Sequence, residues 1–293
     1  MRIPSGATPL HLPPILLLAP ILLVPMAAAA DPAQPAAEGN ARELEALRRF
    51  SFHEPNFAAI DPGLFGRGLN AKFQLSLALR AWTAPAGWTA AGARAIDGTL
   101  ETGLYASFTQ TSYWDLHSDS KPFTDSNYRP ELAWRHLLPP DMIRARAFAL
   151  DIGYYHESNG KDGELSRTID AVAVRPRGEW DLGGDWSLRL EPRLLLPLGA
   201  QTDNPDIFDY RGRIDWNVSF RQAEALAISA RLRVSDEHRA SAELSASYDL
   251  SELHRSLGGR VFAQGFIGWS ESLATYDQEQ RDPRIMVGWA INH

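Results

Sequence analysis

The sequence predicts an all-β protein, a transmembrane antiparallel β-barrel of twelve strands. Three observations lead to this fold class. The first residues have the order of a secretory signal, and no later segment holds the roughly 20 consecutive apolar residues that a membrane helix needs. From residue 70 onward, apolar and polar residues alternate many times over. A secreted chain of this kind is either soluble or a barrel, and the length of the alternating segments favours the barrel.

The N-terminus has three parts in the order of a secretory signal. Arg2 precedes an apolar run at residues 15–24, and small residues follow that run. Residues 1–30 are therefore expected to be a signal peptide. An N-terminal membrane anchor is the alternative, but two prolines interrupt the run and it is short for a spanning helix. Residues 31–53 are expected to be disordered or to form a short helix ahead of the barrel domain, residues 54–293.

The composition excludes several kinds of chemistry. The 293 residues include no cysteine, which rules out disulfides and thiolate metal sites. The formal net charge is -7, and the chain has no long run of like charges. Such a balance gives no indication of a nucleic-acid partner.

The alternating segments are long and carry charge on their polar face. Several run for 10 to 14 residues, whereas strands of soluble proteins usually have about five or six and tilted membrane strands have about 9–11. Arg189, Glu191 and Arg193 share one polar face, a mixture of signs that suits a hydrated, ion-paired interior. The clearest segments are residues 73–80, 104–109, 188–196, 214–220, 226–234, 244–248 and 285–291.

The connections and the number of segments fit a closed barrel. A tight turn at Gly183-Gly184 contrasts with a longer polar loop at 117–128, and tryptophans such as Trp82 near segment ends are typical of membrane interfaces. About eleven strong segments follow residue 70. Since single-chain bacterial barrels normally have an even number of strands, the stretch around Phe57 is expected to supply the twelfth. The alternative is that residues 54–60 form a plug.

Two polar residues continue an outward apolar stripe in the segment 147–158. Phe148, Leu150, Ile152 and Tyr154 define the stripe, and the next positions at a spacing of two are His156 and Ser158. Polar side chains on a lipid-facing wall are costly and usually functional. The pattern thus points to a site at the rim of the outer wall.

Pairing of the next segment adds an acid to this site. A hairpin about Gly163 puts His156 opposite Asp170 and Ser158 opposite Thr168. Directly paired side chains lie about 5 Å apart at Cβ. A serine, a histidine and an acid in this order form a nucleophile, a base and a group that orients the base. A chance tripeptide at a strand end is the alternative for His156 and Ser158 taken alone.

Gln110 is a second polar residue on an outward stripe, between Phe108 and Trp114. Two interpretations stay open. The side chain lies near the polar rim, or a protein partner within the membrane satisfies its amide.

Several motifs resemble those of the outer membrane phospholipase A family. They keep their order and approximate spacing over residues 55–293. The most specific are Tyr155-His156-Glu157-Ser158-Asn159-Gly160, Thr109-Gln110, Asn127-Tyr128 with Pro130, and Asp203-Asn204-Pro205-Asp206. The resemblance covers the whole of the expected mature domain.

The resemblance implies roles for the residues of the site. Ser158 would be the nucleophile, His156 the general base and Asp170 the third member of the triad, where the family typically has asparagine. The backbone N–H of Gly160 would be the oxyanion donor. Calcium would be bound by the backbone carbonyl of Lys161.

Two further calcium ligands and a dimer follow from the same resemblance. The hydroxyl of Ser166 would bind calcium, as would the backbone of Ser120 from the partner subunit, and oxygen ligands suit this hard cation. Gly163 stands where the family has an additional loop acid. Gln110 matches the glutamine at the family's dimer interface. Asp203 and Asp206 are interpreted as turn residues.

The expected function is that of a calcium-dependent phospholipase A1/A2 of the bacterial outer membrane, with its site toward the outer leaflet. It would hydrolyse fatty-acyl esters of glycerophospholipids and lysophospholipids as a homodimer. The alternatives are a passive outer-membrane pore and a lipopolysaccharide deacylase.

Overall fold

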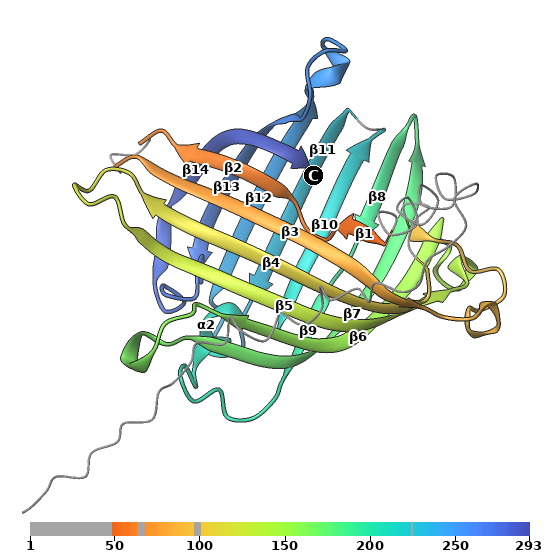
Figure 1. Cartoon of the computed structure of the whole chain (residues 1–293), viewed down its shortest axis with the longest axis horizontal. Helices are drawn as coiled ribbons and strands as arrows, with labels where there is room; N and C mark the ends of the chain where they lie inside the picture. Colours follow the sequence, from red (N-terminus) through yellow and green to blue (C-terminus); the bar gives the residue numbers. More distant parts are fainter. Residues whose placement is uncertain (1–48, 64–67, 97–100, 224) are drawn as a thin grey trace, which may run out of the picture. The chain divides into compact units, whose positions relative to one another are not determined.

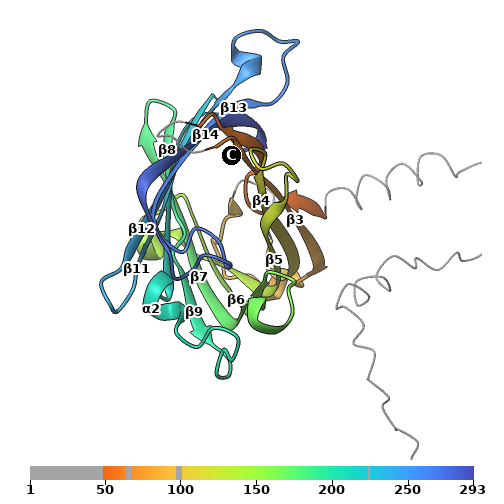
Figure 2. The same cartoon turned by 90° about the vertical axis from the view of Figure 1, so that its left-hand side faces the viewer.

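The computed structural model describes residues 49–63, 68–96, 101–223 and 225–293. Their strands form one antiparallel sheet that closes on itself, because β3 (Asn70–Thr83) pairs with β2 (Asn56–Asp61) on one side and β4 (Gly103–Asp115) on the other. Figure 1 shows the wall from the side, and in Figure 2 the strands follow one another around a ring. Within the described ranges, no helix has the length and apolar character to cross a membrane.

The remaining strands follow one another around the ring with antiparallel pairing. They are β1 (Phe50–Phe52), β5 (Phe123–Leu138), β6 (Ala147–Ser158), β7 (Thr168–Gly183), β8 (Trp186–Leu190), β9 (Arg193–Pro197), β10 (Ile214–Gln222), β11 (Leu226–Val234), β12 (Ala240–Asp249), β13 (Arg260–Trp269) and β14 (Glu279–Asn292). The helices are short: η4 (Ala86–Trp88), η6 (Pro140–Ile143), η7 (Gly163–Leu165), α2 (Ile207–Arg211) and η8 (Leu250–Glu252).

Two pairs of short strands each occupy one place in the ring, so the barrel has twelve strand positions, as predicted. β1 and β2 both pair with β3, and β8 and β9 both pair with β7 and β10. The break between β8 and β9 contains Pro192, and Pro176 lies on β7 beside the same break. Because proline has no N–H to donate, two prolines fit where the pairing is interrupted.

The first strand position differs from the expectation in its boundary. Residues 1–48, which include the expected signal peptide (1–30) and most of the segment 31–53, lie outside the described residues. The end of that segment is β1, so the barrel begins at Phe50 and not at 54. Three residues are too few to reveal a period of two. The alternative of a plug at 54–60 is wrong, because β2 pairs with both β14 and β3.

The two faces of the wall have opposite character. On β3, Leu75 and Leu77 point outward and are 56% and 52% exposed, whereas Gln74 and Ser76 point inward and are buried. An exposed apolar band of this kind suits hydrocarbon and not water. The charged side chains of the interior form ion pairs with one another.

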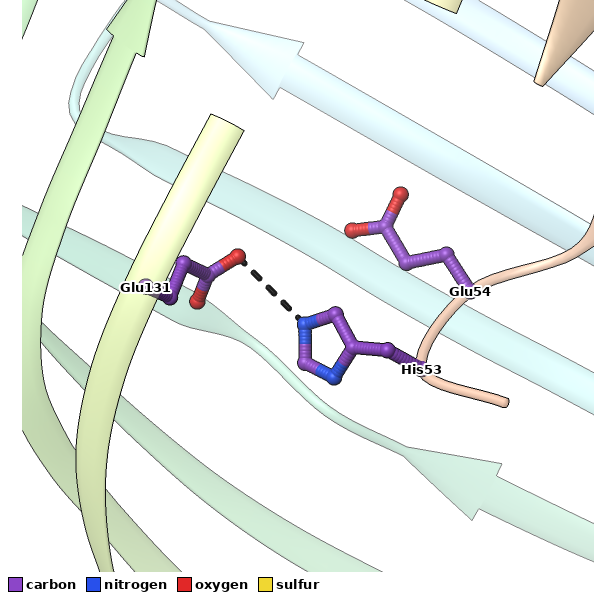
Figure 3. A group of neighbouring side chains, drawn as sticks. All are labelled: His53, Glu54 and Glu131. Carbon is purple, nitrogen blue, oxygen red and sulfur yellow. Dashed lines mark hydrogen bonds and ion pairs between the residues drawn. The ribbon is translucent and has the colours of Figure 1, made fainter. Parts of the chain in front are cut away.

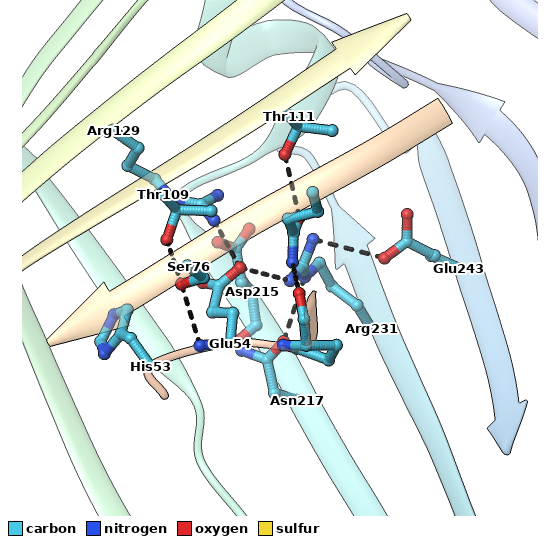
Figure 4. A network of polar contacts seen from close by, with 12 residues as sticks. His53, Glu54, Ser76, Thr109, Thr111, Arg129, Asp215, Asn217, Arg231 and Glu243 are labelled. Atoms are coloured by element: carbon cyan, nitrogen blue, oxygen red, sulfur yellow. Dashed lines mark hydrogen bonds and ion pairs between the residues drawn. The ribbon is translucent and has the colours of Figure 1, made fainter. Parts of the chain in front are cut away.

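The interior is crossed by ion pairs. Between β1 and β2 the chain turns inward at Glu54, whose carboxylate pairs with Arg129 of β5 and Arg231 of β11 (Figure 4). β5 and β11 lie on nearly opposite sides of the ring. Arg193 adds a third guanidinium, 3.6 Å from Glu54. A cavity of about 1220 Å³ lies on the side of this crossing that contains the β7–β8 turn.

Candidate active site

The hairpin of β6 and β7 has the register that the sequence predicts. His156 pairs with Asp170, Tyr154 with Val172 and Ser158 with Thr168. The two strands lie side by side in Figure 1, and the connection between them includes η7.

The paired residues lie on the outer face of the barrel. Ile152 and Tyr154 are 45% and 46% exposed, whereas Asp151 and Tyr155, which flank them on the strand, are buried. His156 shares its face with Tyr154, and its side chain is 28% exposed. The outward placement of a histidine and an acid is confirmed.

Two donors converge on one oxygen of Asp170. Nδ1 of His156 lies 2.9 Å from Oδ1 of Asp170. The hydroxyl of Tyr154 donates to the same oxygen. Because a carboxylate only accepts, this contact selects the neutral tautomer with the imidazole proton on Nδ1, in which Nε2 is the acceptor.

Ser158 lies two residues further along the same face of β6. Two residues of a strand span about 6.6 Å, a distance that an extended imidazole can bridge. No hydrogen bond between His156 and Ser158 is found among the contacts of the described residues. The structure therefore brings His156 and Asp170 into contact and places Ser158 next along the strand.

The loop after Ser158 is held by Asn159, a residue of the shared motif for which the sequence predicts no separate role. Its side-chain oxygen accepts from the backbone N–H of Arg167 at 3.0 Å, and its amide donates to the carbonyl of Leu165 at 2.9 Å. Gly160 follows with a φ of +64°. A Cβ there would come 3.1 Å from the ring of Tyr128, so the left-handed turn and the close ring both favour glycine.

Two of the predicted calcium ligands lie on this loop. Ser166 lies near its end, and its hydroxyl donates to Oδ2 of Asp203 at 2.6 Å. Lys161 is exposed on the same loop, and Ser120 is exposed on the loop between β4 and β5. The sequence predicts a turn at Asp203, and only its presence in a shared motif indicates a further role. A carboxylate and a hydroxyl in contact are donors that calcium accepts.

Asp206, by contrast, has a structural partner. It accepts a hydrogen bond of 2.7 Å from the hydroxyl of Tyr276, over whose ring lies the guanidinium of Arg167. Burial and the Asp206 carboxylate raise the pKa of Tyr276, so the phenol keeps its proton and remains a donor. This contact ties the 198–213 loop to the one between β13 and β14.

Gln110 lies on β4 beside other polar side chains. Its amide donates to the hydroxyl of Ser112 at 3.1 Å, and Ser112 is 2.9 Å from the hydroxyl of Ser126. One neighbour thus satisfies part of the amide within the chain. The remaining hydrogen-bonding capacity of the Gln110 amide is available to groups outside the chain.

A second cluster, inside the barrel, was not anticipated. His53, Glu54 and Glu131 could bring three ligand atoms within 4.8 Å of one another (Figure 3). Both carboxylates are already paired: Glu54 with the arginines described above, and Glu131 with Arg175 and Arg193 at 3.3 Å each. A cation there would have to displace guanidiniums, so this cluster does not fit a calcium site.

Comparison with known proteins decides the family. A family model described as phospholipase A1 matches residues 49–291. The chain belongs to the phospholipase A1 family. The phospholipase A1 of Klebsiella pneumoniae is 30% identical over 223 residues, which is 75% of this chain and 70% of that protein. That of Escherichia coli K12 is 30% identical over 224 residues, covering 75% and 69%.

Solved structures agree with the family and with the fold. The outer membrane phospholipase A of Escherichia coli has a TM-score of 0.64 and 27% identity, over 83% of this chain and 91% of that one. A Salmonella typhi outer membrane phospholipase, solved as a dimer with bound calcium, has a TM-score of 0.63 and 26% identity, over 83% and 92%. As a member of the phospholipase A1 family with this barrel, the chain is an outer-membrane phospholipid hydrolase of bacteria.

Proposed function

We propose that this barrel hydrolyses fatty-acyl esters of glycerophospholipids and lysophospholipids with Ser158 as nucleophile and with calcium. The observation that carries the proposal is the 2.9 Å contact between His156 and Asp170 on the outer face of the barrel. Structural ion pairs in barrels face the interior, as those around Glu54 do here. A histidine–carboxylate pair facing lipid calls for a chemical explanation.

The residues of the site have distinct roles in acyl transfer. Asp170 holds His156 with its proton on Nδ1, and Nε2 takes the proton of the Ser158 hydroxyl as its oxygen attacks the ester carbonyl. The backbone N–H of Gly160 donates to the oxyanion. His156 then protonates the leaving alkoxide, and an acyl-enzyme on Ser158 remains. A water then gives a proton to His156 as its oxygen attacks the acyl carbonyl, and His156 returns a proton to the Ser158 oxygen as the fatty acid leaves.

The oxygen donors near Ser166 fit calcium. The Ser166 hydroxyl, the carbonyl of Lys161 and the backbone of Ser120 from a second copy of the chain would hold it, and we add the Asp203 carboxylate. Bound there, calcium would supply positive charge near the developing oxyanion. The Ser166–Asp203 contact supports this ligand set, since it already joins a hydroxyl and a charged oxygen.

A dimer would complete the site from the outer face. Gln110 would contribute part of the interface, and the apolar wall beside it would carry the acyl chains. The active-site loops would face the outer leaflet. The dimeric, calcium-bound relative from Salmonella typhi supports this arrangement.

The direct test is acyl release from phospholipid in mixed micelles, with and without calcium. Wild-type protein should release fatty acid only with calcium, and Ser158→Ala should release none while it remains a folded barrel. Ser229→Ala, on the inner face of β11, is the matched control and should keep full activity. Full activity of Ser158→Ala would remove Ser158 as nucleophile. Release from lipopolysaccharide instead of phospholipid would favour a deacylase.

A further inference from the structure

The strand that carries Asp170, β7, extends beyond the end of its neighbour β9. β7 begins at Thr168, but the last register pair between β7 and β9 joins Ala171 to Pro197. Beyond this pair the chain leaves the sheet and enters the loop 198–206. The backbone groups of Asp170 and Thr168 on that side therefore need partners from the loop.

Two side-chain amides of this loop act in place of a strand. Gln201 accepts from the backbone N–H of Asp170 at 3.0 Å and donates to its carbonyl at 2.9 Å. Asn204 repeats the pattern on Thr168, with distances of 2.7 Å and 2.9 Å. Each amide thus makes both hydrogen bonds that a paired residue would make.

This arrangement sets the distance between the catalytic side chains. The N–H and the carbonyl of Asp170 point toward Gln201 and Leu198, and hence away from β6. His156 and Asp170 are therefore a non-hydrogen-bonded pair, the kind whose Cα atoms lie about 4.5 Å apart and whose side chains are closest. The Gln201 amide fixes the backbone from which the Asp170 carboxylate reaches the imidazole.

Gln201 also has an unusual backbone conformation. Its φ is +49°, in the left-handed region that residues other than glycine and asparagine seldom adopt. Its amide donates a further hydrogen bond to the carbonyl of Leu198 at 2.8 Å. Such a conformation persists where surrounding contacts hold it.

We propose that Gln201 is a positioning residue, whose side-chain amide pairs with the backbone of Asp170 and thereby holds the acid that orients His156. The inference rests on the proposed function of the His156–Asp170 pair. Asn204, which is fully buried, pairs in the same way with Thr168, two residues before Asp170 on the same strand edge.

The test is a double-mutant cycle between Gln201 and Asp170, measured as kcat and KM for phospholipid at saturating calcium. Gln201→Ala should lower kcat about tenfold with little change in KM, because binding of the acyl chains is untouched. Gln201→Glu keeps the size and the acceptor but loses both donors, and it should lose at least as much. In an Asp170→Ala background, Gln201→Ala should change kcat by less than about twofold.

Controls separate this role from folding, from calcium binding and from the proposed function. Thr202→Ala, an exposed neighbour, should match wild type, and heat-modifiable migration on gels should show every variant folded. The calcium concentration for half-maximal activity should be unchanged in Gln201→Ala. An equal loss of kcat with and without Asp170, or a shift in calcium requirement alone, would overturn the positioning role. Full activity of Ser158→Ala would instead overturn the proposed function.

Discussion

At the scale of single residues, the acid of the candidate triad has a second donor. Tyr154 and His156 both hydrogen-bond Oδ1 of Asp170. A hydroxyl that points at this atom requires an acceptor there. As a donor, the tyrosine thus favours an oxygen of the side chain at position 170 on the side that faces the imidazole.

This geometry makes a prediction for Asp170→Asn. The amide should place its oxygen toward Tyr154 and keep the imidazole proton on Nδ1, so kcat should fall by less than about tenfold. Asp170→Ala, which removes the acceptor, should lose about a hundredfold. Steady-state acyl release measures both.

Tyr154→Phe supplies the control. In that background the amide can turn its NH2 group toward His156, so Asp170→Asn should lose far more activity than it does alone. Equal losses from Asp170→Asn in the two backgrounds would contradict the role given to the tyrosine.

At the scale of elements, the calcium ligands supplied by one copy of the chain would come from two loops that meet. Ser166 lies at the end of the β6–β7 connection and Asp203 on the loop after β9, and their side chains are in contact. Gly163, at the tip of the first loop, brings no side chain to the site. The carboxylate of Asp203 would then be the main charged ligand.

Asp203→Asn should therefore raise the calcium concentration needed for half-maximal activity about tenfold, the effect of about 1.4 kcal/mol of lost binding. At saturating calcium, kcat should stay near that of wild type. Titration of activity, together with direct calcium binding by calorimetry, measures the shift. Asp209→Asn, an exposed carboxylate on α2, should leave both unchanged, and an equal shift in that variant would point to general surface charge.

Local alternation predicts elements whose partners are neighbours in sequence. The β6–β7 hairpin follows from the stripe that ends in His156 and from the turn at Gly163, and so does the pair with Asp170. The Gln201 contact joins residues 31 apart through a side chain and a backbone, and no periodicity marks it. The division of residues 188–196 into β8 and β9 was also missed, since the apolar period continues across Pro192.

At the scale of the whole molecule, the interior is stabilised by ion pairs between different elements. The sequence of a single strand cannot predict these pairs. Asp215 of β10 is 1% exposed and accepts hydrogen bonds from Arg193, Arg211 and Arg233 at 2.8, 2.9 and 2.7 Å. These arginines come from β9, α2 and β11. The alternation of sequence predicted charges inside the barrel but not which of them pair.

Asp215→Asn should lower the free energy of unfolding by about 3–5 kcal/mol, because two buried guanidiniums and a third that is largely buried would lose their shared counter-charge. Urea unfolding in lipid vesicles, followed by tryptophan fluorescence, measures the difference. Glu237→Gln, on an exposed turn, should stay within about 0.5 kcal/mol of wild type. A small effect of Asp215→Asn would mean that water enters the interior and screens these groups.

The outward placement of the His156–Asp170 pair also determines how substrate arrives. A site that opens sideways into a bilayer is supplied by diffusion within a surface and not from the aqueous phase. Turnover should then follow the mole fraction of phospholipid in the micelle or bilayer, and dilution with an inert detergent at constant total phospholipid should slow it. Addition of more vesicles of the same composition should not speed a barrel that is already embedded in one.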